Sequence, residues 1–335
     1  MAALLGVLNR EVSRADIQSQ APDLLATVRE MVDEGTNLFG RLLTETNRVR
    51  RIRPFHTALL LFFRHTIELL DAVDELFRGG IFTPAALQVR AIVEAHMQIL
   101  YLFGMRTEYL PSVAGPGSFD PVPRDGNGVA LMGQALEDVR DDRGLAYIVA
   151  EYRRLARQAA SYDAASLAQL AAKYNITLPP QITDPTVHAG IAAEAVKFQT
   201  QLSTPEFAPI DAAFTAARGT QPYDPPWYSL AGGPKKVRRL AESVGLMAYY
   251  EMFYGDASEV MHGTNIGGQL GQVTPGGGTA AAPLRNFDMA AQVGRCVIMQ
   301  IMPIYQLAIR ALRPSDMGLW QQWTQRWAPI AGSLR

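Results

Sequence analysis

The sequence has almost no cysteine. Cys296 is the single cysteine among 335 residues, and it lies in an apolar run that ends at Met299. One thiol allows no disulfide within the chain and no zinc site built on cysteines. We therefore expect a cytoplasmic protein, because structural disulfides are typical of secreted ones.

An excess of charge of one sign is also missing. The chain has 31 lysine and arginine residues against 32 aspartate and glutamate residues, with a formal net charge of -1. No global basic field is available to hold nucleic acid. Binding of this kind therefore needs a local basic patch.

Long apolar runs and a leader sequence are missing as well. One of the longest apolar runs, Ala58 to Phe63, is far shorter than the roughly 20 residues of a membrane helix. The first residues, Met1 to Leu5, have neither the basic region nor the cleavage pattern of a signal peptide. We expect no membrane association.

Apolar residues, in contrast, are plentiful at 48% of the chain, which is enough for a large core. They recur at helical spacing and predict an all-α fold, an antiparallel helical bundle with a helical insertion. Residues 1–110 supply its N-terminal helices, 111–222 a loop and the insertion, and 223–335 the C-terminal helices of the same bundle. A Gly-rich loop covers 263–283, and strands are expected only there.

Three tryptophans near the C-terminus lie on one side of a short predicted helix. Trp320, Trp323 and Trp327 are spaced i, i+3, i+7. No basic polar face accompanies them, so docking on the body of the protein is favoured over binding at a membrane surface.

A polar stripe follows the predicted helix 55–78. Its members recur every three or four residues, which places them on one face: Arg64, Glu68, Asp71, Glu75 and Arg78. The solvated face of an amphipathic helix explains this pattern, and His65 lies beside it.

The predicted helix 84–103 is different, because it is apolar on nearly all sides and such helices are typically buried. Arg90, Glu94 and Gln98 recur every four residues and share one narrow stripe. A buried Arg–Glu pair can be structural or can belong to a functional site, and both alternatives stay open. His96 lies on another side, where a core histidine with satisfied hydrogen bonds is favoured.

A third polar face belongs to the predicted helix 235–262. Glu251, Gly255, Ser258 and His262 are spaced by 4, 3 and 4 residues and share one side. Gly255 permits a neighbour to approach closely. His262 ends the helix beside the Gly-rich loop. It either interacts with the C-terminal carbonyls of its own helix or belongs to a site that opens onto the loop, and the second is favoured.

These faces supply the candidate catalytic residues, which are His262, Ser258, Arg90 and Glu94. Ser258 and His262 are close enough on a helix to act as a nucleophile and base, but no oxyanion donor is evident beside them. The sequence has no phosphate-binding loop, no dinucleotide-binding glycine pattern and no His-Glu-x-x-His run. Enzyme classes that depend on these motifs are excluded.

A divalent metal is the alternative cofactor. Glu259-x-x-His262 matches half of a di-metal carboxylate site in a helical bundle, although the second Glu-x-x-His that such sites need is missing. A mononuclear site stays open. The candidate ligands are His262, Glu259 and Glu251, with further carboxylates available at Glu68 and Glu94.

Two segments carry a family resemblance. The first contains Arg64-x-x-x-Glu68, then Gly80 and Leu87-x-x-Arg90-x-x-x-Glu94. The second contains Trp227, Gly245 and Tyr250-x-x-x-Tyr254-x-x-x-Ser258-x-x-x-His262-Gly263. Together they resemble a bacterial all-helical family, a domain of unknown function, over residues 55–105 and 225–312. The resemblance implies that the polar residues of both segments converge, and it implies no reaction. A distant likeness to HEPN-type helical proteins would imply action on RNA or a role in phage defence.

Three functions are compatible with these observations. The first is an RNA-acting or defence-associated protein of HEPN-like architecture that uses Arg90 and His262. The second is a metal-dependent enzyme with Glu and His ligands, and the third is a non-catalytic module that binds a small ligand or a partner. The expected partners are RNA or a small molecule, and a second copy of the chain as a homodimer.

Overall fold

The computed structural model shows a helical protein made of two compact units. It describes residues 19, 21–48, 52–106, 122–123, 133–161, 164–177, 184–255, 270–271, 280–281 and 288–334. The all-α prediction is confirmed, because these residues are mainly helical and form only four two-residue strands. One unit is drawn from residues 1–136 and 237–335, and the other from residues 137–236.

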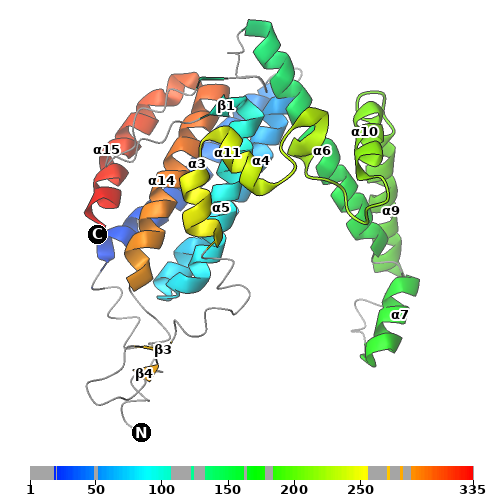
Figure 1. Ribbon diagram of the computed structural model, residues 1–335, viewed down its shortest axis with the longest axis horizontal. Helices are drawn as coiled ribbons and strands as arrows, with labels where there is room; N and C mark the ends of the chain where they lie inside the picture. The colour runs from blue at the N-terminus through cyan, green and yellow to red at the C-terminus, as the bar shows by residue number, and fades with distance from the viewer. Residues whose placement is uncertain are drawn as a thin grey trace. The chain divides into compact units, whose positions relative to one another are not determined.

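The first unit is built around α14 (Asp288–Leu312). This helix packs against α3 (Pro22–Arg48), α4 (Pro54–Arg78), α5 (Phe82–Phe103) and α15 (Met317–Ser333), so helices from both ends of the chain meet (Figure 1). Its short elements are α11 (Val237–Val244), α12 (Met247–Tyr249), the π-helical turn η2 (Tyr250–Gly255) and the 3-10 turn η4 (Pro314–Asp316). Within the described residues, every helix is too short or too polar to serve as a membrane span.

Proline and glycine set the limits of α4 and α5. Pro54 opens α4, where its fixed φ suits the first helical turn. Gly79 and Gly80 follow the last turn of α4, and Gly80 has a φ of 70°. Gly104 ends α5 in the left-handed conformation with a φ of 68°, which glycine adopts without strain.

Two tryptophans dock α15 on the first unit. Trp323 and Trp327 are buried with 1% exposure, and their rings stack with centroids 5.3 Å apart. Trp320 is half-buried and its Nε1 donates to the carbonyl oxygen of Met302 at 3.3 Å. The predicted docking of the tryptophan stripe is confirmed.

Tyr305 joins α14 to α3. Its side chain is fully buried, and its hydroxyl donates to the carbonyl oxygen of Met31 at 2.7 Å. Gly35, one turn further along α3, leaves the space that the phenol occupies. A Cβ at this position would lie 2.0 Å from the Tyr305 hydroxyl oxygen, which is far inside van der Waals contact.

The second unit contains α6 (Gly133–Ser161), α7 (Ala164–Tyr174), α9 (Pro185–Leu202), α10 (Ala208–Arg218) and the 3-10 turn η1 (Trp227–Gly232). Its core is small, and the buried side chains include Phe214, Trp227 and Tyr228. The insertion was predicted at residues 111–222, whereas this unit spans 137–236.

The four short strands form two antiparallel pairs. β3 (Leu270–Gly271) pairs with β4 (Ala280–Ala281) inside the Gly-rich loop, whose other residues lie outside the described part of the chain. β1 (Met105–Arg106) pairs with β2 (Val122–Pro123) outside that loop. The prediction that strands would be confined to the loop was therefore wrong. Two residues are too few for an alternating pattern to reveal a strand.

Candidate functional site

α5, which carries the second polar stripe, lies beside the segment that carries the third polar face. α5 packs against α4 and α14, and it also contacts α11 and η2. The two predicted helices are thus neighbours where they are described. Ser258, Glu259 and His262 lie outside the described residues, so their convergence with Arg90 and Glu94 stays a prediction.

The side chains of Arg90 and Glu94 on α5 are only half-buried. Burial raises the pKa of the Glu94 carboxyl, and the positive charge of Arg90 opposes this shift without cancelling it. A carboxyl group in this state keeps its proton to a higher pH than an exposed one. The pair therefore combines a cation with a carboxyl of raised pKa, which suits both a structural contact and a site.

His96 is a core residue, as predicted. It is 2% exposed, and its Nδ1 donates to Oε1 of Gln300 on α14 at 2.7 Å. Nε2 is buried and has no hydrogen-bond partner among the described residues, so the prediction of a fully satisfied histidine is only half met. Burial lowers the pKa of His96 to about 4. The hydrogen bond to Gln300 acts in the opposite direction, and its effect is smaller.

This burial predicts a loss of stability in mild acid. His96 stays neutral in the folded protein down to about pH 4, whereas an unfolded chain protonates it below about pH 6.5. The unfolded state binds more protons between these limits. Protonation of His96 alone should therefore lower the free energy of unfolding by about 3 kcal/mol between pH 7 and pH 4.

Urea unfolding at both pH values measures this effect, with His96→Gln as the control because glutamine does not titrate. The relevant quantity is the difference in pH slope between the two proteins, since all other histidines and carboxylates contribute to both. Equal slopes would show that His96 does not titrate as its burial requires.

The segment after α11 changes helical pitch at η2. Here the backbone forms a π-helical turn over Tyr250–Gly255, a distortion that often occurs at functional sites. Glu251, a candidate metal ligand, is exposed in this turn, and its carboxylate lies 3.2 Å from the guanidinium of Arg238. No group of three or more His, Cys, Asp or Glu that would hold a metal occurs among the described residues, which do not include Glu259 or His262.

The stripe on α4 is a solvated face, as the sequence indicates. Arg64 and Glu68 form an ion pair at 3.1 Å with 64% and 58% of their side chains exposed. The buried charged residue of α4 is Asp74, which does not belong to this stripe. Asp74 is fully buried, and its Oδ2 lies 3.2 Å from Arg29 and 3.0 Å from Arg78.

A basic run precedes and opens α11. Lys235, Lys236, Arg238 and Arg239 are all exposed. The two arginines pair with acidic neighbours, Arg239 with Glu242 at 2.6 Å and Arg238 with Glu251 as above. The two lysines form no ion pair within the described part of the chain. This is a local basic patch of the kind that nucleic-acid binding needs.

Lysine usage makes this patch distinctive. The whole chain has only four lysines, Lys173, Lys197, Lys235 and Lys236, and two of them are adjacent here. The sequence interpretation missed the patch because the overall charge is balanced. The signal that would have found it is the clustering of a rare residue.

The second unit holds a buried ion cluster centred on Arg153 and Asp224. Arg153 donates from Nε and Nη2 to the two carboxylate oxygens of Asp224 at 2.7 and 2.9 Å, and it also pairs with Asp211. Arg157 binds Asp224 as well, and Arg218 lies 3.8 Å from it. Burial alone would raise the pKa of Asp224, but the hydrogen bonds from Arg153 and Arg157 prevail and lower it to about 2.

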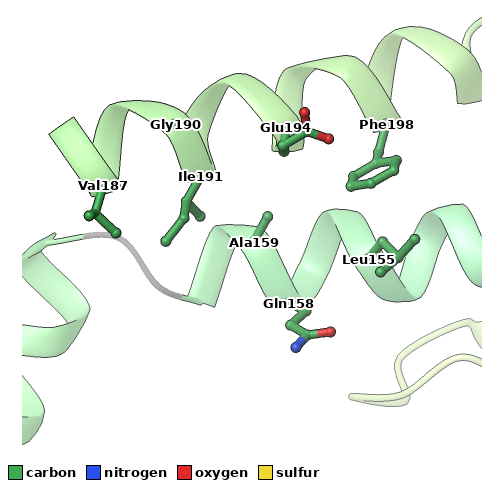
Figure 2. A pocket seen from close by; sticks show the side chains of 8 residues that line it. All are labelled: Leu155, Gln158, Ala159, Val187, Gly190, Ile191, Glu194 and Phe198. Atoms are coloured by element: carbon green, nitrogen blue, oxygen red, sulfur yellow. The ribbon is translucent and has the colours of Figure 1, made fainter. Parts of the chain in front are cut away.

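An apolar groove of about 490 Å³ lies between α6 and α9 of the same unit. Figure 2 shows Leu155 and Ala159 of α6 facing Ile191 and Phe198 of α9, with Glu194 and Gln158 among the lining residues. An open groove of this composition can take an apolar side chain or ligand. The described residues carry nothing that identifies its occupant.

Comparisons with known proteins add no assignment. No family model, no curated protein and no solved structure matches this chain.

Proposed function

We propose that the protein binds and acts on RNA. The observation that carries the proposal is the exposed basic run Lys235–Arg239, with two lysines that no described carboxylate neutralises. A compact run of cations supplies the sequence-independent attraction to a phosphate backbone that the near-neutral net charge of the chain does not supply.

The polar residues of α5 are the proposed site of action. Arg238 and Arg239 of the basic run lie on α11, and α11 packs on α5, which carries Arg90 and Glu94. A guanidinium group binds a phosphate through paired N–H donors, and a carboxyl with a raised pKa can donate a proton to a leaving oxygen. His262, which the sequence places on the same chain segment as η2, is the proposed base. This is the function that a distant likeness to HEPN-type proteins would imply.

Replacing both Lys235 and Lys236 by alanine should weaken RNA binding roughly 20-fold at 0.1 M salt. This value follows from the release of counterions by two phosphate contacts, each of which contributes about 0.7 to the slope of log K against log salt for a single strand. The slope itself should become shallower by about 1.4. Fluorescence anisotropy with a labelled 12-nucleotide oligouridine RNA measures both quantities.

The matched control is the double replacement of Lys173 and Lys197 by alanine. It removes the same two charges from other exposed positions, so the net charge of the two variants is equal. We expect the control to bind like the wild type. Equal losses in both variants would mean that only net charge matters, and no binding by the wild type would refute the proposed function.

Cleavage of the same RNA tests the polar site separately. Glu94→Gln keeps the shape of the side chain and removes the proton that the carboxyl can donate, so cleavage should fall while binding persists. A metal-dependent enzyme would instead lose cleavage on chelation and regain it when the metal is restored, and a non-catalytic module would show no cleavage at all.

A further inference from the structure

The aromatic side chain of Tyr223 is exposed to solvent. Its exposure is 81%, whereas Trp227 and Tyr228, only a few residues later, are buried. An aromatic ring exposed to this degree gains little from burial in its own unit. Its position leaves the ring accessible to a ligand.

The backbone on both sides of Tyr223 is restricted. Pro222 precedes it, and Asp224 is followed by Pro225, so few backbone conformations are open to the segment. Asp224 is anchored in the buried ion cluster with Arg153. The ring is thus presented on a rigid support, and a ligand that stacks on it loses little freedom of the protein chain.

Two arginines contact the residue that follows Tyr223. Asp224, the following residue, is bound by Arg157 and approached by Arg218, whose side chains are 45% and 33% exposed. The cluster holds three arginines, the third being Arg153, against two aspartates, Asp211 and Asp224, so it carries a net charge of +1. Partly exposed guanidinium groups of this kind bind phosphate.

We propose that Tyr223 is a stacking platform for an unpaired base of single-stranded RNA, with the adjoining phosphate held by Arg157 and Arg218. The inference rests on the proposed function and names its substrate class. A base in a duplex has both faces covered by its neighbours, so only a single strand offers a free face to the ring. An exposed neutral ring, followed in the chain by a residue that two arginines contact, offers one group to the base of a nucleotide and others to its phosphate.

Tyr223→Ala should weaken binding of the oligouridine RNA by about 5- to 150-fold, which corresponds to loss of one stacked base. The slope of log K against log salt should not change, because the ring has no charge. Tyr223→Phe should bind within about twofold of the wild type, since the stacking face remains. A 12-base-pair duplex RNA should bind Tyr223→Ala and the wild type equally.

The two proposals fail in different ways. If Tyr223→Ala binds the single strand as well as the wild type while the Lys235 and Lys236 variant does not, the stacking site is overturned and the proposed function stands. Equal losses for single-stranded and duplex RNA would also overturn it, because stacking on a free base predicts a difference. If the wild-type protein binds no RNA, both proposals are wrong. The 81% exposure of Tyr223 means that its replacement leaves the core intact, which a thermal unfolding curve verifies.

Discussion

Replacing Gly35 by alanine is expected to lower the free energy of unfolding by about 4 kcal/mol. The new Cβ would lie 2.0 Å from the hydroxyl oxygen of Tyr305 and 2.8 Å from its Cζ. Tyr305 is fully buried and cannot swing into solvent, so the clash must shift α14 against α3 or break the hydrogen bond to Met31. Overpacking of a core costs about 1 to 3 kcal/mol, and an unsatisfied buried partner costs about as much again.

Gly40→Ala provides the control on the same helix, because a Cβ there has nothing within 4 Å. It should stabilise the protein by up to about 1 kcal/mol, through the better helix propensity of alanine alone. Denaturant unfolding of both variants gives the comparison. A double-mutant cycle with Tyr305→Phe should show coupling to Gly35→Ala, since the phenol oxygen is the closest atom. Equal effects of the two alanine variants would mean that α3 and α14 do not meet as closely as described.

Arg153→Ala should destabilise the second unit by about 3 to 5 kcal/mol. Arg153 and Asp224 have 9% and 8% of their side chains exposed, so removal of the guanidinium leaves a buried carboxylate with only the more exposed Arg157 and Arg218 as partners. Breaking a buried ion pair by deleting one member has this cost because the other charge remains buried. Hydrogen exchange of α6 and α10, read by mass spectrometry, reports on this unit separately from the first.

The next residue supplies the control. Arg154 is 55% exposed and pairs with Glu151 at the surface, so Arg154→Ala should change stability by less than about 1 kcal/mol. The two variants remove the same side chain from adjacent positions on α6. If their effects on hydrogen exchange were alike, the ion cluster would not be what holds α6 to α10.

The sequence predicts the helices well because periodicity is a local signal. The apolar character of α5, the solvated stripe of α4 and the docking of Trp323 and Trp327 all follow from spacing within one helix. Proline and glycine mark the ends of α4 and α5 for equally local reasons.

Buried charge could not be predicted in the same way. Arg153 pairs with Asp211 and Asp224, which lie 58 and 71 residues away in the sequence. No pattern within α6 distinguishes Arg153 from Arg154. Asp74 does not belong to the polar stripe of α4. Only its spacing of four residues from Arg78 indicates that the two form an ion pair. The candidate site shares this difficulty. Spacing identifies Arg90 and Glu94 as one stripe, but the degree to which they are buried depends on helices elsewhere in the chain.

The insertion of residues 137–236 into the first unit affects the order of folding during synthesis. α3, α4 and α5 leave the ribosome before the second unit, whereas α14, around which they pack, follows it. At roughly 5 to 20 residues per second, these 100 residues (237 − 137) delay α14 by roughly 5 to 20 s. Throughout this interval the apolar surfaces that pack against α14 in the folded protein have no native cover, so we expect chaperones that bind exposed apolar segments to act on the nascent chain.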